Sequence, residues 1–276
     1  MSKRWYRILR AALVVIVAVA SLAAVGAIYE SSASASARDA QLVPPGRLID
    51  VGEHRLHLHC EGAGSPTVVL EAGGGNSSVT FRPLMRVLAE STRVCAYDRA
   101  GFGYSRPLQS ERDAERVAAE LLELLTRAGE AGPYVLAAHS MGGLDALALA
   151  SEHPDEVAGL DQVALTPEPD RREARAHVLR TDFCSTAYAE AVALERSAHR
   201  LLGVAPEGPT VVMVAGARSA DDWPPDDARW RAAQNELAAG STHGRVVVVD
   251  GGHYLPLELP ERVASEVAAL LDLVRR

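Results

Sequence analysis

The sequence lacks the motifs with which nucleotide-binding domains hold a phosphate group. Its glycine run, Gly73–Gly75, is not followed by the Lys-Ser or Lys-Thr pair of a P-loop, and the G-x-G-x-x-G spacing of a dinucleotide site is missing. No basic patch follows the first ten residues, and the net charge of the 276 residues is -8. These absences argue against a nucleotide cofactor and against a nucleic acid partner.

Residues that could bind a metal are few and poorly arranged. His54, His57, His59 and Cys60 lie close together, but the alternation of a β-strand puts His57 and His59 on one face with Arg55. A solvated or edge face of a sheet accounts for that pattern better than a zinc site does. We therefore expect no metal or other cofactor, and nothing around the three cysteines suggests a thiol nucleophile.

The N-terminal segment carries a targeting signal. Four basic residues precede a mostly apolar, uncharged stretch, 11–29, and a Ser/Ala segment, 31–37, follows it. The stretch is long enough for a membrane anchor, whereas the small residues favour a signal peptide cleaved near Ala37. In either case the basic leader stays in the cytoplasm, so we expect residues 41–276 to form an extracytoplasmic domain after a leader and linker, 1–40. The basic residues are Lys3, Arg4, Arg7 and Arg10.

Ser140 lies at the centre of the segment Ala-His-Ser-Met-Gly-Gly, residues 138–143. An apolar run, 134–137, precedes this segment and a helix of small residues, 144–150, follows it, which is the strand, sharp turn and helix of a serine nucleophile elbow. Ala138 stands where the usual G-x-S-x-G pattern has glycine, a departure that adds one methyl group. The alternative is a serine that only caps a helix, but a cap does not explain the glycine pair.

His253 follows a run of valines that predicts a buried strand, 245–249, and precedes an amphipathic helix that opens at Pro260. A loop thus carries an imidazole just past a strand end. A single histidine is more often structural, but the chain order of Ser140, a carboxylate and then His253 is that of one class of serine hydrolases.

Four motifs in order resemble those of the α/β-hydrolase superfamily, from about Arg47 to the end of the chain. The resemblance implies an α/β fold with an eight-stranded, mostly parallel sheet flanked by helices and a short helical cap at 167–208. The motifs are LEAGGGNSS (70–78), YDRAGFGYS (97–105), AHSMGG (138–143) and DGGHYLPLELPERV (250–263).

The resemblance also implies catalytic roles. Ser140 would be the nucleophile and His253 the general base, and the backbone N–H groups of Gly74 and Met141 would form the oxyanion hole. A shift of one residue in the first loop would give Gly75 the role of Gly74. Asp98 and Arg99 belong to a motif that usually braces loops near the site, and we interpret them as structural.

The carboxylate of the triad is the residue that the pattern places least well. The usual G-x-x-D turn after the seventh strand ends here in Ser219, and Asp221 and Asp222 follow it. A second known place, after the sixth strand, offers only Glu168. We rank Asp221 first, Asp222 second and Glu168 third, although the two aspartates could also cap the helix that follows.

Cys60 and Cys95 belong to strands that are neighbours in the strand order of the superfamily. A disulfide between them is therefore reasonable in an oxidising compartment, with Cys184 left over. Two buried free thiols would look the same in the sequence.

These features together predict a serine hydrolase that cleaves a small-molecule carboxylic ester, bound to the membrane through its N-terminal segment if that segment is uncleaved. An aminopeptidase or amidase on the same fold is the first alternative, and a catalytically silent interaction protein is the second. Ser140 excludes the aspartate nucleophile of epoxide hydrolases and dehalogenases.

Overall fold

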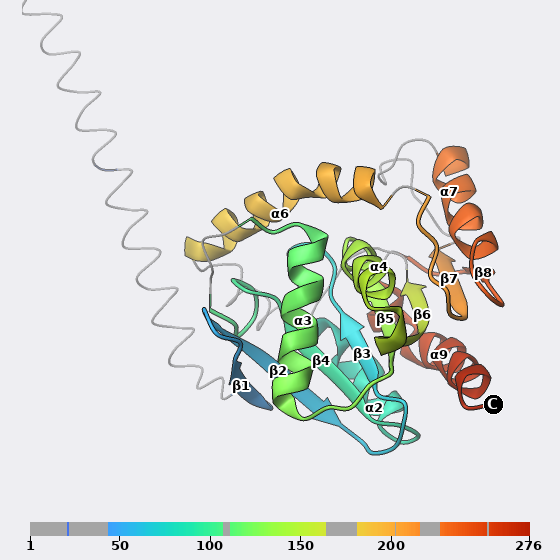
Figure 1. Cartoon of the computed structure of the whole chain (residues 1–276), viewed down its shortest axis with the longest axis horizontal. Coiled ribbons are helices and arrows are strands. Elements are labelled where there is room, and N and C mark those ends of the chain that lie inside the picture. The colour runs from blue at the N-terminus through green and yellow to red at the C-terminus, as the bar shows by residue number, and fades with distance from the viewer. Residues whose placement is uncertain are drawn as a thin grey trace, which may run out of the picture.

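An eight-stranded sheet forms the centre of the molecule (Figure 1). The structure is a computed structural model that describes residues 21, 44–106, 111–163, 181–201, 203–215, 227–252 and 254–276. The strand order is β1-β2-β4-β3-β5-β6-β7-β8, as expected. β2 pairs antiparallel with β1 and β4, and the remaining pairs are parallel. The strands are β1 (Arg47–Asp50), β2 (Arg55–Glu61), β3 (Val68–Glu71), β4 (Val94–Asp98), β5 (Tyr134–His139), β6 (Val157–Val163), β7 (Thr210–Ala215) and β8 (Arg245–Val249).

Helices cover both faces of the sheet, so its central strands are buried along their whole length and read as apolar runs. α3 and α4 pack on one face, and α2 and α9 pack on the other (Figure 1). This arrangement confirms the predicted sheet with flanking helices. The helices are α2 (Arg82–Leu88), α3 (Ala114–Ala128), α4 (Gly142–Glu152), α6 (Thr181–Arg200), α7 (Asp227–Ala239), α8 (Leu255–Glu258) and α9 (Pro260–Val274), with short 3-10 helices η1 (Ser78–Phe81) and η2 (Pro154–Glu156).

Local signals fix the ends of α3, which packs against α4 on one face of the sheet. The Asp113 side chain accepts a hydrogen bond from the Arg116 backbone N–H (3.2 Å) and caps the N-terminus of α3. At the other end Gly129 has a φ of 78°, a left-handed conformation that glycine adopts without a steric cost.

α6 lies within the stretch predicted as a cap, and it crosses above the ends of α3 and α4 (Figure 1). The Ala114 backbone N–H donates to Ser197 Oγ (3.0 Å), and Arg200 Nη2 lies 2.9 Å from Asp113 Oδ2. The start of α3 is therefore joined to the second half of α6. The predicted cap, 167–208, also includes residues 167–180, which lie outside the described residues.

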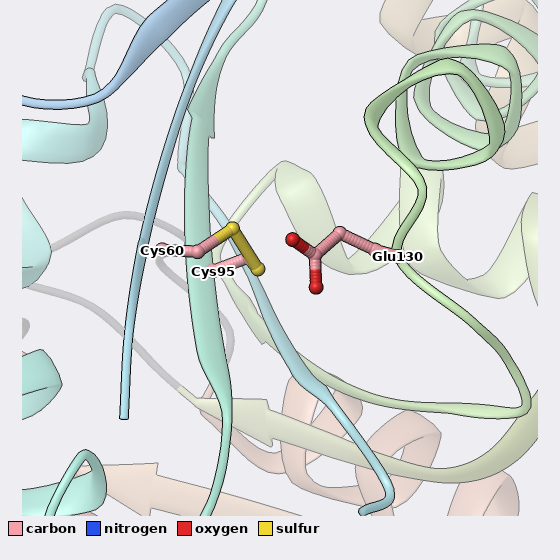
Figure 2. Close-up of side chains that lie close together, drawn as sticks. All are labelled: Cys60, Cys95 and Glu130. Atoms are coloured by element: carbon pink, nitrogen blue, oxygen red, sulfur yellow. A yellow bond between two sulfur atoms is a disulfide. The ribbon is translucent and has the colours of Figure 1, made fainter. Parts of the chain in front are cut away.

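A disulfide joins β2 to β4 through Cys60 and Cys95 (Figure 2). The two residues are directly opposite in the antiparallel register. The carboxylate of Glu130 points toward the disulfide in Figure 2 and is held by Arg93, whose Nη2 lies 2.6 Å from Glu130 Oε1.

No helix in the described part of the chain is long and apolar enough to cross a membrane. The stretch predicted as an anchor or signal peptide, 11–29, lies outside the described residues except for Ser21.

Candidate active site

Ser140 occupies a sharp turn between β5 and α4, the turn that the sequence predicts. Its φ is 59°, in the left-handed region that residues with a side chain rarely adopt. A left-handed conformation costs roughly 1–2 kcal/mol, so the surrounding structure must hold it in place. The Gly143 backbone N–H donates to the Ser140 carbonyl oxygen (2.8 Å), which closes the turn directly into α4. Ser140 is half-buried at the helix N-terminus, where backbone N–H groups favour negative charge.

The glycine pair makes the turn possible because two other chain segments approach it closely. A Cβ atom on Gly142 would lie 2.5 Å from the Ala72 carbonyl oxygen. A Cβ atom on Gly143 would overlap the amide end of the Gln162 side chain. Ala138, which replaces the first glycine of the usual pattern, is fully buried within β5 and is accommodated there.

The loop after β3 passes directly over the turn. A Cβ atom on Gly73 would lie 2.9 Å from Ser140 Cβ, and one on Gly74 would lie 3.3 Å from Met141 Sδ. Gly75, the alternative to Gly74, has a φ of 71°. The structure thus brings Gly73 close to Ser140 and Gly74 close to Met141, while the roles of Gly74 and Met141 as oxyanion donors stay a prediction.

His253 lies outside the described residues, but the residue that follows it is in contact with the turn. The ring of Tyr254 packs on the ring of His139, which precedes Ser140, with 4.9 Å between centroids. The Tyr254 hydroxyl also exchanges hydrogen bonds with the Asn76 side chain, at 3.0 and 3.1 Å. The C-terminal loop is therefore anchored both to β5 and to the loop that carries Gly74.

A buried arginine fastens the Gly74 loop to β3 and to α6. Arg99 is 2% exposed, and its Nη1 donates to Glu71 Oε1 (2.8 Å) and to the carbonyl of Ala72. Its Nη2 donates to the Gly73 carbonyl (2.9 Å). The Nε and Nη2 edge binds both carboxylate oxygens of Glu190, at 2.8 and 3.1 Å. These contacts agree with the structural interpretation of Arg99.

The same cluster contains more carboxyl groups than guanidinium groups. Burial raises the pKa of Glu71. Burial and then the charge of Glu71 raise the pKa of Asp145 well above its usual range. Burial alone would lower the pKa of Arg99, but Glu190 and Glu71 raise it well above its ordinary value. Arg99 therefore stays charged.

The Asp98 side chain binds two loops, the one after β3 and the one after β4. Its carboxylate accepts hydrogen bonds from the backbone N–H groups of Ser78 (2.6 Å) and Tyr104 (2.9 Å), and it lies 2.8 Å from His57 Nδ1. Burial would lower the pKa of His57, but the hydrogen bond and charge of Asp98 raise it overall.

The placement of His57 on a solvated or edge face was wrong. Its side chain is fully buried, because the loop after β4 covers it: the ring of Tyr104 lies 4.9 Å away, and Ser105 Oγ accepts the His57 backbone N–H (2.8 Å). The histidine is a partner of Asp98 and of the Pro45 carbonyl.

Cys60, Cys95 and Glu130 form the one group in the described part of the chain whose ligand atoms lie close enough for a metal (Figure 2). The two sulfur atoms are bonded to each other, and the Glu130 carboxylate forms a salt bridge with Arg93. As they stand, these residues do not form a metal site.

The candidate acids Asp221, Asp222 and Glu168 lie outside the described residues. Among the described residues, Asp145 and Glu190 belong to the buried cluster around Arg99 but were not predicted from the sequence. The spacing of Gly142, Asp145, Ala146 and Leu149 puts Asp145 on the buried stripe of α4, and this periodicity could have revealed it. No comparable local pattern singles out Glu190.

Comparison with known proteins agrees with this architecture. The family model of the alpha/beta hydrolase fold matches residues 66–175. An esterase from Thermogutta terrifontis, solved with malate bound, has a TM-score of 0.66 at 24% identity over 84% of this chain and 100% of its own. The epoxide hydrolase CorEH has a TM-score of 0.67 at 18% identity, over 83% of this chain and 98% of its own. The chain has the α/β-hydrolase fold.

Sequence relatives match a smaller part of the chain than these structures do. YbdG of Bacillus subtilis, an uncharacterized protein, is 26% identical over 160 residues, which are 57% of this chain and 49% of YbdG. The match therefore spans about half the length of that relative.

The close approach of Ala72 to Gly142 predicts a large difference between two substitutions in the turn. Gly142→Ala should lower the free energy of unfolding by about 1–3 kcal/mol, because the added methyl group meets backbone that cannot turn away. Gly143→Ala is the matched control: it gives the same gain in helix propensity, but it meets the flexible end of Gln162 and should cost less. Urea unfolding of both variants measures the difference, and a Gly142→Ala protein as stable as the wild type would contradict the tight crossing.

Proposed function

We propose that this protein is a serine hydrolase of the α/β-hydrolase superfamily. It would cleave carboxylic esters through an acyl-enzyme on Ser140. The observation that carries the proposal is the left-handed φ of Ser140 at the strand-to-helix turn, with Gly74 lying against Met141. Such a turn presents a hydroxyl group at a helix N-terminus, where backbone N–H groups favour developing negative charge.

In the proposed mechanism His253 takes the proton of Ser140 as the hydroxyl oxygen attacks the ester carbonyl. The backbone N–H groups of Gly74 and Met141 would hold the oxyanion, each donor contributing about 3 kcal/mol by analogy with measured oxyanion holes. Collapse of the tetrahedral intermediate expels the alcohol, which receives the proton from His253. Water then attacks the acyl-enzyme with the same base and releases the acid.

The positions of the surrounding groups support this mechanism. Arg99 holds the carbonyls of Ala72 and Gly73, so the loop of the proposed oxyanion donor is fixed before substrate binds. Tyr254 anchors the segment next to His253 on His139 and Asn76. Preorganised dipoles of this kind lower the barrier because they do not have to reorient during the reaction.

The resemblance to epoxide hydrolases extends to the fold but not to the proposed nucleophile. Those enzymes use an aspartate at the turn, and this chain has a serine there. An amidase or aminopeptidase would use the same serine.

We also propose that the domain works outside the cytoplasm, anchored by residues 11–29 or released by cleavage near Ala37. The basic leader before that stretch and the Cys60–Cys95 disulfide support this location, because disulfides persist in oxidising compartments.

The purified chain should hydrolyse p-nitrophenyl esters of short acids in the presence of EDTA. Ser140→Ala should lower kcat by about 10⁴-fold or more, since removing the nucleophile of a triad costs up to ~10⁶-fold. Release of p-nitrophenol measures both. Activity that survives Ser140→Ala, or that EDTA abolishes, would contradict the proposed mechanism.

The triad acid can be assigned by three conservative substitutions measured side by side. If Asp221 orients His253, Asp221→Asn should lower kcat by roughly 10²–10⁴-fold, because an amide supports the wrong imidazole tautomer and cannot stabilise the imidazolium. Asp222→Asn and Glu168→Gln should then have mild effects. A large loss at Asp222 or Glu168 alone would move the role to that residue, and no loss at any of the three would contradict all three assignments.

A further inference from the structure

A small cavity lies beside the proposed oxyanion donor Met141. It is found where α6 crosses the first turns of α3 and α4 (Figure 1). The cavity leaves about 10 Å³ for the centre of a water molecule, which is room for one such molecule and for no larger organic group. Its wall includes Arg112, Val117, Met141, Asp145 and Glu190.

Arg112 brings two unpaired N–H donors to this wall. The side chain is 3% exposed, and its Nη1 donates to both carboxylate oxygens of Glu120, at 2.9 and 2.8 Å. Its Nε and Nη2 atoms are buried and have no hydrogen-bond partner among the described residues. Leaving buried donors of a charged group unpaired is unfavourable, so a partner for them is expected in the cavity.

Asp145 and Glu190 bring acceptors to the same wall. Asp145 is 6% exposed, and its Oδ2 atom has no hydrogen-bond partner in the described part of the chain. Each carboxylate oxygen of Glu190 accepts one hydrogen bond from Arg99, at 2.8 and 3.1 Å. A carboxylate oxygen can accept two, so each keeps one free lone pair. The cavity is therefore bordered by donors and by acceptors.

Only a ligand that both accepts and donates hydrogen bonds satisfies such a wall. A cation would meet the charge of Arg112, and an anion would meet the acceptor oxygens of Asp145 and Glu190. A buried water molecule typically makes about three hydrogen bonds, as acceptor and as donor. It also suits either protonation state of Asp145, because it can donate to a carboxylate or accept from a carboxylic acid.

We propose that one water molecule is bound in this cavity as part of the folded protein. It accepts hydrogen bonds from the free N–H groups of Arg112 and bonds to Asp145 Oδ2. The water joins the segment before α3 to the first turn of α4, with Glu190 of α6 in the same wall. Because Met141 also belongs to that wall, the water lies behind the proposed oxyanion donor. The inference goes beyond the proposed function and does not depend on it, since the site involves no reaction at Ser140.

A crystal structure of the full chain, at a resolution that shows ordered waters, tests the site directly. We expect a water peak about 2.7–3.2 Å from Asp145 Oδ2 and from Nε or Nη2 of Arg112. A cavity without density overturns the proposal. A peak with the anomalous signal of chloride overturns it as well, because the ligand would then be an anion.

The sign of a stability change provides a test in solution. Val117→Ile adds one methyl group to the cavity wall and should displace the water. The unfolding equilibrium constant from urea titration should then rise by about 5- to 150-fold, because Arg112 and Asp145 lose their partner. In a dry cavity the same methyl group would fill space and stabilise the protein. A Val117→Ile protein at least as stable as the wild type therefore overturns the proposal.

Two further variants separate the loss of water from simple crowding. Val192→Ile is the matched control, because Val192 is 50% exposed on α6 and is not part of the cavity wall. It should change the unfolding constant by no more than about twofold. Arg112→Met removes the donors that bind the water, so adding Val117→Ile to it should cost little. An undiminished cost on that background would show that the methyl group is merely overpacked, which contradicts the water site.

Discussion

The left-handed backbone at Ser140 is the constraint on which the rest of the site depends. A residue with a side chain holds this conformation at a cost of roughly 1–2 kcal/mol, and the contacts around the turn must supply it. The cost is met because glycine at position 142 lets the Ala72 carbonyl approach where any side chain would collide. The β3 loop and the turn are thus locked together, and a shift of either would displace Gly74 from Met141.

Arg99 extends this constraint from the turn to α6. Burying a guanidinium group is expensive unless its hydrogen bonds are satisfied, and here five hydrogen bonds connect it to Glu71, to Glu190 and to the carbonyls of the β3 loop. Breaking a buried pair of this kind typically costs about 3–5 kcal/mol. α6 is therefore held to the loop that carries Gly74.

The buried strands and the turn at Ser140 were predicted from local patterns, whereas the eight-stranded sheet and its strand order followed from the resemblance to α/β-hydrolases. Apolar runs mark buried parallel strands, and the small residues at 138–143 mark the turn. The resemblance also predicted that the strands of Cys60 and Cys95 are neighbours, because the order of strands follows from the fold.

Buried polar groups were predicted less well, because their partners are distant in the chain. His57 alternates with leucines as a solvated face would, yet the loop after β4 covers it. Arg99 meets Glu190 across 91 positions, and Arg112 meets Glu120 across eight. No periodicity encodes such contacts. The triad acid is a similar case, since its position depends on the course of a loop.

The central claim is that the turn presents Ser140 as an activated nucleophile, and covalent labelling by a fluorophosphonate tests it most directly. Such probes react with serine hydroxyl groups that a neighbouring base activates, independently of the substrate that the enzyme prefers. Peptide mapping after labelling should find a single phosphonate adduct on Ser140, absent after denaturation and absent from Ser140→Ala. An unlabelled native protein, or an adduct on a serine other than Ser140, would contradict the account.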